Sequence, residues 1–228
     1  MQEVYEFLFV RGGPVMYPIA IGSVLALALF MERVWVLRKE RVIPSGFRGR
    51  LRSLVREGKV SEAEILCQEN GSALANVVSS GLKNHGKSVG EIKEAITEGG
   101  RREVAGLERH VDLLGTIAAV EPLMGLLGTV TGLIRAFQRV EALAEKGGGV
   151  NPGALSAGIW EALITTAAGL VVAIPAYVAY RYLQGKVNGL VVEMEDDSLG
   201  IAALIASSGR GAAKFSGNSD HSANREGE

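Results

Sequence analysis

The chain has 228 residues, of which 47% are hydrophobic, 21% charged and 6% aromatic, and its formal net charge is −1. This near-neutral balance gives no electrostatic attraction to phosphate, so we expect no nucleic-acid partner. The single cysteine, Cys67, excludes a disulfide framework within the chain and a multi-cysteine zinc site, and the three scattered histidines offer no ligand spacing, so we expect neither a metal nor a cofactor.

The hydrophobic residues gather into long runs, which is typical of a membrane protein. The first run, 12–31, has no charged residue and is long enough for an α-helix to cross about 30 Å of hydrocarbon. We therefore predict a first transmembrane helix over 12–36, preceded by a segment over 1–11 that lies in the outer interface. A cleaved signal peptide is the alternative, which the acidic residues Glu3 and Glu6 disfavour.

Lysine and arginine residues concentrate directly after this span, within 37–56, whereas the segment before it has only Arg11. Because loops rich in these residues stay in the cytoplasm, the N-terminus is expected outside and 37–112 is expected to form a small cytoplasmic helical domain. Within that domain we predict three short helices, opening at Pro44 and at the caps Ser61 and Ser72, with breaks at Gly58, Gly71 and Gly86.

Apolar residues recur with helical spacing from about residue 89, and no proline follows until Pro122. This pattern predicts one helix from 89 to about 138 that leaves the cytoplasm and includes a second transmembrane helix over 113–137. The predicted fold is therefore an all-α membrane protein with three transmembrane helices, two of them long and extending into the cytoplasm.

A periplasmic loop is predicted over 138–153, where glycines interrupt the pattern, and a third transmembrane helix follows over 154–181. An apolar stripe continues over 182–206 and predicts a cytoplasmic extension of this helix. Glycine, serine, asparagine and charged residues dominate 207–228, so we predict a disordered cytoplasmic tail.

Two carboxylates, Glu121 and Glu161, interrupt the second and third spans. An unpartnered carboxylate in lipid costs several kcal/mol, so such groups usually face water or the protein interior. Small residues share a helix face with Glu121 on span two, namely Gly125, Gly128 and Gly132. A second stripe of small residues lies on span three, namely Gly158, Ala162, Thr165 or Thr166, and Gly169. We expect these two faces to pack closely and antiparallel.

The polar groups also have an ordinary structural interpretation. Threonine in a membrane helix commonly bonds its own helix, Pro122 and Pro175 can be simple kinks, and the two glutamates can lie at the membrane surfaces. Four threonines together with two carboxylates on only two helices favour a polar path instead: Thr129, Thr131, Thr165 and Thr166.

The stretches PLMGLLGTVTGLIRAF (122–137) and NPGALSAGIWEALITTAAGLVVAIPAYVAY (151–180) resemble the signature of the MotA/TolQ/ExbB proton-channel family. Three spans with an outside N-terminus are similar to ExbB and TolQ rather than to flagellar MotA, which has four. The resemblance implies a homopentamer in the bacterial inner membrane around a dimer of an ExbD- or TolR-like single-span partner, whose membrane aspartate accepts the proton. Such a stator would use the proton-motive force to energise transport or mechanical work, with a TonB- or TolA-like protein as a further partner.

The resemblance makes Thr129 and Thr166 the pore-lining threonines and Glu161 the glutamate of the EAL motif, and it matches Pro122 and Pro175 to the family's membrane prolines. Glu121 departs from the small residue expected before this proline, which leaves open a place in the pore, in a subunit interface or at the membrane surface. With antiparallel spans we expect Thr129 and Thr166 at similar depth. Glu161 would then lie about 7.5 Å nearer the outside and Glu121 about 12 Å nearer the cytoplasm.

Two other functional classes are alternatives to the stator, which is a membrane motor component. A non-conducting scaffold would use the same small-residue faces only for packing, whereas a transporter acting alone would show repeated halves and broken helices. An enzyme is not expected, because no nucleophile with a matched base and no phosphate-binding loop is present. A neighbouring gene for a single-span protein with a membrane aspartate would favour the motor. The resemblance leaves open H⁺ or Na⁺ as the ion, and nutrient uptake, envelope maintenance or motility as the work.

Overall fold

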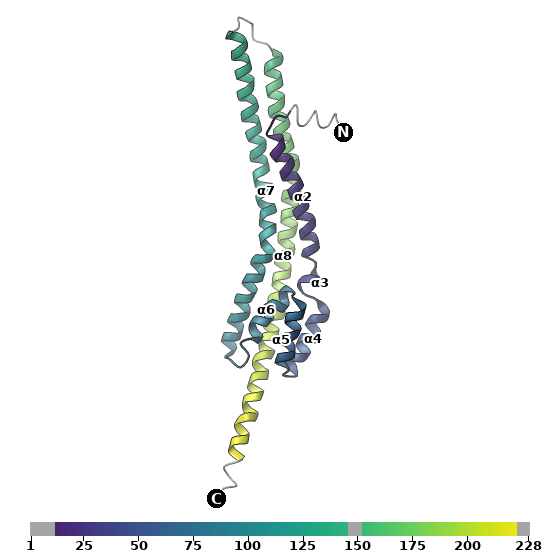
Figure 1. The fold of residues 1–228 in the computed structure, drawn as a ribbon, viewed down its shortest axis with the longest axis vertical. Coiled ribbons are helices and arrows are strands. Elements are labelled where there is room, and N and C mark those ends of the chain that lie inside the picture. Colours follow the sequence, from purple (N-terminus) through teal and green to yellow (C-terminus); the bar gives the residue numbers. More distant parts are fainter. Residues whose placement is uncertain (1–11, 146–151, 223–228) are drawn as a thin grey trace. The chain divides into compact units, whose positions relative to one another are not determined.

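The computed structural model describes residues 12–145 and 152–222, with side chains as far as residue 207, and this part of the chain is helical without strands (Figure 1). Its helices are α2 (Met16–Val36), α3 (Lys39–Val42), α4 (Ser45–Arg56), α5 (Val60–Asn70), α6 (Ala73–Leu82), α7 (Val89–Glu145) and α8 (Pro152–Ser222). Three of these, α2, α7 and α8, are long and apolar enough to cross a membrane. The predicted all-α, three-span fold is thereby confirmed.

The chain divides into two compact units, and each is described by itself. The three-helix unit contains the chain up to Arg33 and His110–Gln184, and the helical domain contains Val34–Arg109 and the chain from Gly185 onward. The divisions fall within α2, α7 and α8 and lie three residues from our predicted membrane boundaries at 36, 113 and 181. The position of these boundaries relative to a bilayer stays a prediction.

Local sequence signals explain where the two long helices begin. At the start of α7, the Ser88 Oγ accepts a hydrogen bond from the Glu91 amide at 3.3 Å, and the Glu91 carboxylate accepts one from the Ser88 amide at 3.0 Å. This reciprocal capping satisfies two free amides and fixes the helix start at Val89, where the pattern predicts it. Helix α8 begins at Pro152, because proline suits the first turn of a helix.

Apolar side chains hold the three-helix unit together. Val15, Met16 and Ile19 at the start of α2 pack with Ile164 of α8, and Met124 of α7 lies against this cluster. The outward face of α2 stays apolar, with Ile21, Val24 and Leu27 at least 60% exposed. An exposed apolar surface of this kind is expected of a helix that meets lipid or another subunit.

The helical domain contains the short helices that the sequence predicts, with one start corrected. Helix α4 opens after Pro44, and the Ser72 hydroxyl caps α6 by accepting from the Ala75 amide at 3.3 Å. The predicted cap at Ser61 is wrong, because α5 already begins at Val60. The φ angle of 74° at Gly58 shows why: this turn reverses the chain early enough for the next helix to start before the serine.

An ionic network joins the basic helix α4 to the acidic segment of α8 within the helical domain. The buried Asp197 carboxylate accepts from Arg48 at 2.9 Å and from Arg52 at 2.8 Å. The Lys39 ammonium lies 2.7 Å from the Glu193 carboxylate. Hydrogen bonding to Asp197 raises the pKa of Arg48, and the hydrogen bond from Lys39 lowers the pKa of Glu193.

Helices α7 and α8 extend into two regions that the sequence predicts to be non-helical, 138–153 and 207–228. Helix α7 continues to Glu145, well into the predicted loop over 138–153, because no breaker occurs before the glycines at 147–149. Helix α8 continues to Ser222, within the segment 207–228 for which the sequence predicts disorder; residues 223–228 lie outside the described residues, and disorder of this tail stays a prediction. No proline follows Pro175, so glycine and serine weaken the helix there without interrupting its hydrogen bonds. The predicted interfacial segment 1–11 lies outside the described residues.

Candidate functional site

Helices α7 and α8 approach each other closely along their glycines. A Cβ on Gly125 would lie 3.1 Å from the Thr166 Cα, and one on Gly128 would overlap the Thr165 side chain. A Cβ on Gly132 would lie 3.1 Å from the Gly158 carbonyl oxygen. The span-two glycine stripe therefore faces span three, in the antiparallel sense that the sequence predicts.

The same contact continues at both ends of the stripe. A Cβ on Gly158 would lie 3.0 Å from the Ala136 Cα, and one on Gly169 would lie 2.7 Å from the Glu121 carbonyl oxygen. Pro122 and Pro175 lie inside α7 and α8 without ending them. The contacts therefore define one continuous register, in which residue numbers fall on α8 as they rise on α7.

This register fixes the relative depth of the candidate threonines. Thr129 follows Gly128, whose contact is Thr165, the neighbour of Thr166. The two threonines thus lie within about 3 Å of the same level, given a rise of 1.5 Å per residue. A similar depth is what we expected for two residues that face one partner group.

The threonine hydroxyls do not meet one another. Thr166 donates to the Gly125 carbonyl oxygen across the helix contact at 3.2 Å, whereas Thr129 donates to the Leu126 carbonyl of its own helix at 2.6 Å. Thr131 and the fully buried Thr165 also bond carbonyls of their own helices. Among these four threonines, Thr166 is therefore the one whose hydroxyl hydrogen bond joins two helices.

Glu161 forms an ion pair that the sequence reasoning missed. Its Oε1 lies 2.5 Å from the Arg135 Nη1, and its side chain is only 11% exposed. The turn at Gly13, just before α2, packs against this ion pair. The φ angle of Gly13 is 70°, and a Cβ there would lie 2.9 Å from the Arg135 Nη1. The pair could have been predicted from the helix contact. An antiparallel register that places Gly132 against Gly158 and Ala162 also brings Arg135 near Glu161.

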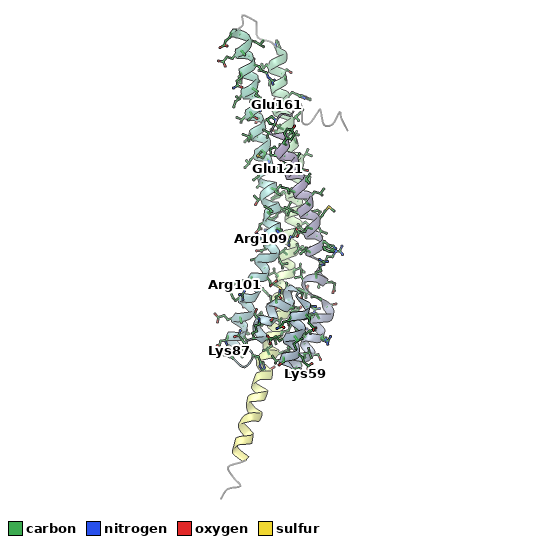
Figure 2. The ribbon with its side chains drawn as sticks, in the orientation of Figure 1. Lys59, Lys87, Arg101, Arg109, Glu121 and Glu161 are labelled. Carbon is green, nitrogen blue, oxygen red and sulfur yellow. The ribbon has the colours of Figure 1, made fainter. Side chains whose placement is uncertain are left out.

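Glu121 lies elsewhere, at a lower level toward α2 (Figure 2). Its side chain is buried, and its Oε2 has no hydrogen-bond partner. The carboxyl lies directly against Gly22 of α2, where a Cβ would come 2.9 Å from the Glu121 Cδ. The backbone of Glu121 thus belongs to the α7–α8 contact, while its carboxyl fills the space left by a glycine of α2.

A second charged cluster lies at the opposite end of α2. Arg33 is 5% exposed, and its Nη2 contacts the His110 Nδ1 of α7. The same imidazole nitrogen lies 3.5 Å from the Glu32 carboxylate. Sequence reasoning gave His110 no role, because nothing in its local spacing points to a residue on another span. Within the described residues, no group of histidine, cysteine and acidic side chains gathers in a form that could hold a metal ion.

Comparison with known proteins adds a family to this geometry. The family model described as the MotA/TolQ/ExbB proton channel family matches residues 69–196, which include all of α7 and the apolar part of α8. The chain is 36% identical to the putative biopolymer transport protein ExbB-like 1 of Synechocystis, over 77% of this chain and 68% of that protein. It is 28% identical to the biopolymer transport protein ExbB of Pseudomonas putida, over 84% of this chain and 59% of that one. It is 42% identical to the Tol-Pal system protein TolQ of Haemophilus influenzae, over 39% of this chain and 37% of that protein.

Proposed function

The chain belongs to the MotA/TolQ/ExbB proton channel family, and we propose on this basis that it is an ion-conducting stator subunit of the bacterial inner membrane. In this proposal it uses the proton-motive force, together with an ExbD- or TolR-like single-span partner, to energise transport or mechanical work at the outer membrane or envelope. The relatives named for biopolymer transport and for the Tol-Pal system support this class of work. The excess of lysine and arginine after span one supports a periplasmic N-terminus and a cytoplasmic C-terminus.

The proposed assembly is a homopentamer around a partner dimer. Helices α7 and α8 form its inner wall, and α2 faces the lipid bilayer. The exposed apolar face of α2 supports a lipid-facing position. Exposed apolar residues also remain on α7, including Leu123, Leu126 and Val130, and contact with neighbouring copies would remove them from solvent.

The observation that carries the proposal is the position of the family match over the two helices joined by the Thr166–Gly125 hydrogen bond. A threonine hydroxyl that donates to a backbone carbonyl still accepts a bond from a carboxylic acid. If the hydroxyl rotates away from that carbonyl, it can donate to a carboxylate. Thr166 and Thr129 therefore suit a partner aspartate that is protonated and deprotonated in turn. Each charge crossing 100 mV supplies about 2.3 kcal/mol, enough to bias one conformational step.

Co-purification with an ExbD- or TolR-like single-span protein tests the assembly. We expect native mass measurement to give five copies of this chain and two of the partner. A chain that stays monomeric in mild detergent, with no partner bound, would contradict the proposal.

A non-conducting scaffold is the second candidate, and one observation favours it. The hydroxyls of Thr129, Thr131 and Thr165 donate to carbonyls of their own helices, which is the ordinary structural role of threonine in a membrane helix. The two candidates differ in ion flux. A stator complex dissipates an imposed H⁺ or Na⁺ gradient during work, and a scaffold leaves both gradients unchanged.

A further inference from the structure

Glu121 has no counter-charge along the spans that surround it. The runs 12–31 on the first span and 162–180 on the third contain no acidic, basic or histidine residue, and Glu121 is the only such residue within 113–134. Of the basic groups in the three-helix unit, Arg135 pairs with Glu161, Arg33 contacts His110 and Arg181 donates to Gln184. Glu121 as a whole residue is 4% exposed, and its Oε2 atom has no hydrogen-bond partner.

Two contacts between α2 and α7 fix the depth of this carboxyl. Glu121 lies against Gly22, and His110 contacts Arg33. The two positions are 11 residues apart on each helix, so both contacts belong to one antiparallel register. They are separated by about 16 Å along the axis, given a rise of 1.5 Å per residue.

This depth lies near the centre of the bilayer rather than at its surface. Arg33 and His110 form the charged end of the three-helix unit, and a point about 16 Å from it lies halfway through about 30 Å of hydrocarbon. Gly22 independently falls in the middle of the charge-free run 12–31. Of the three positions that the sequence left open for Glu121, the membrane surface is therefore disfavoured.

The carboxyl also lies inside one subunit rather than in a pore. It is buried by this chain alone, and the α2 position that faces it is a glycine with no room for a Cβ. Further subunits can only increase this burial. An ionised carboxylate that is buried without a partner is far more costly than a neutral carboxylic acid, because hydrocarbon does not solvate the charge.

We propose that Glu121 is a proton-binding site at mid-membrane, between α2 and α7 of each subunit and separate from the threonines of the α7–α8 contact. The ligand is a single proton, which keeps the carboxyl neutral. Glu161, in contrast, is paired with Arg135. Release of the proton requires α2 to move away from α7, because only the space at Gly22 separates the carboxyl from the α2 backbone. The site does not depend on ion conduction along Thr129 and Thr166.

Infrared spectroscopy of the full chain in lipid membranes tests this site directly, because the carbonyl stretch of a protonated carboxylic acid is separate from the bands of a carboxylate. We expect a protonated-acid band at neutral pH that is lost in Glu121→Gln and kept in Glu161→Gln. The proposal is overturned if Glu121→Gln removes a carboxylate band instead. It is equally overturned if addition of Na⁺ converts the acid band to a carboxylate band, since the site would then bind a metal cation.

A second pair of variants tests the contact between the Glu121 carboxyl and Gly22 without relying on protonation. Gly22→Ala should lower the midpoint of thermal unfolding in detergent, because its methyl group overlaps the Glu121 carboxyl. The double variant Gly22→Ala with Glu121→Ala should recover most of the loss. Equal midpoints for Gly22→Ala and the natural chain, or no recovery in the double variant, would contradict the placement of Glu121 against α2.

Discussion

Arg135 of α7 and Glu161 of α8 form an ion pair of 2.5 Å between Nη1 and Oε1, and the turn at Gly13 packs against both groups. The pair therefore joins the entry to α2 with both other spans. It also explains how a glutamate with an 11% exposed side chain is accommodated in an apolar helix.

Removal of the Arg135 charge should destabilise the three-helix unit. Arg135→Ala leaves Glu161 nearly buried without its partner, and loss of one member of a fully buried pair costs about 3 to 5 kcal/mol. The cost should be smaller here because Arg135 is 35% exposed. The exchange Arg135→Glu with Glu161→Arg should restore much of the loss in thermal unfolding of the purified protein. Single variants as stable as the natural chain would show that the pair contributes nothing.

Thr166→Val and Thr129→Val should reduce energy-dependent transport or motility without preventing assembly of the complex. Valine keeps the β-branched shape and removes only a hydroxyl, whose hydrogen bond contributes about 0.5 to 1.5 kcal/mol net. Energy-dependent transport or motility in cells should fall while recovery of the complex is unchanged. Thr165→Val is the matched control, because Thr165 is fully buried and its hydroxyl donates to carbonyls of its own helix. Full activity of both Thr166→Val and Thr129→Val would make them packing residues.

Gly128→Leu should damage the α7–α8 contact, since even a Cβ at this position overlaps Thr165. Overpacking of a close contact typically costs about 1 to 3 kcal/mol, and a leucine here pushes two backbones apart. Gly106→Ala is the control, because a Cβ at Gly106 meets no atom within 4 Å. It should be neutral or stabilise α7 by up to about 1 kcal/mol. Similar complex recovery for both variants would refute the close contact.

The helical domain should lose stability in acid through Glu193. The hydrogen bond from Lys39 lowers the pKa of Glu193 below its ordinary value of 4.5. A lowered folded-state pKa means that the contribution is complete above the unfolded-state pKa and is lost as the pH falls through the folded-state pKa. Glu193→Gln should therefore flatten part of the decline in thermal stability below about pH 4.5. An unchanged acid profile in this variant would exclude Glu193 as a cause.

Cys67 should report unfolding of the helical domain. Burial raises the pKa of its thiol to about 12, so the reactive thiolate is scarce near neutral pH. Maleimide labelling should be slow in the native protein and should become fast over the same urea range in which helicity is lost. Rapid labelling in the absence of urea would contradict a packed α5–α6 region.

The features that the sequence predicts correctly depend on local pattern. The start of α7 at Val89 follows from apolar periodicity, and the three spans follow from the lengths of the uncharged runs. The antiparallel contact of α7 and α8 could also be predicted. An α-helix turns by about 100° per residue, which places Gly125, Gly128 and Gly132 on one face.

The features that were missed depend on the register between helices. Arg135 lies beyond the apolar run of span two, and only its level relative to α8 makes it the partner of Glu161. A projection of span two alone places Glu121 with the glycines that face α8. The structure turns its carboxyl toward Gly22, because a side chain departs from its backbone position and fills whatever space a neighbouring helix leaves.

Proton flux into liposomes tests the central claim most directly. The purified chain and its single-span partner would be reconstituted together around a pH-sensitive dye, with a membrane potential imposed. We predict flux that requires both proteins and falls strongly in the double variant Thr129→Val with Thr166→Val, while the complex stays assembled. A fully assembled natural complex that conducts neither H⁺ nor Na⁺ under this potential would contradict the stator and favour the scaffold.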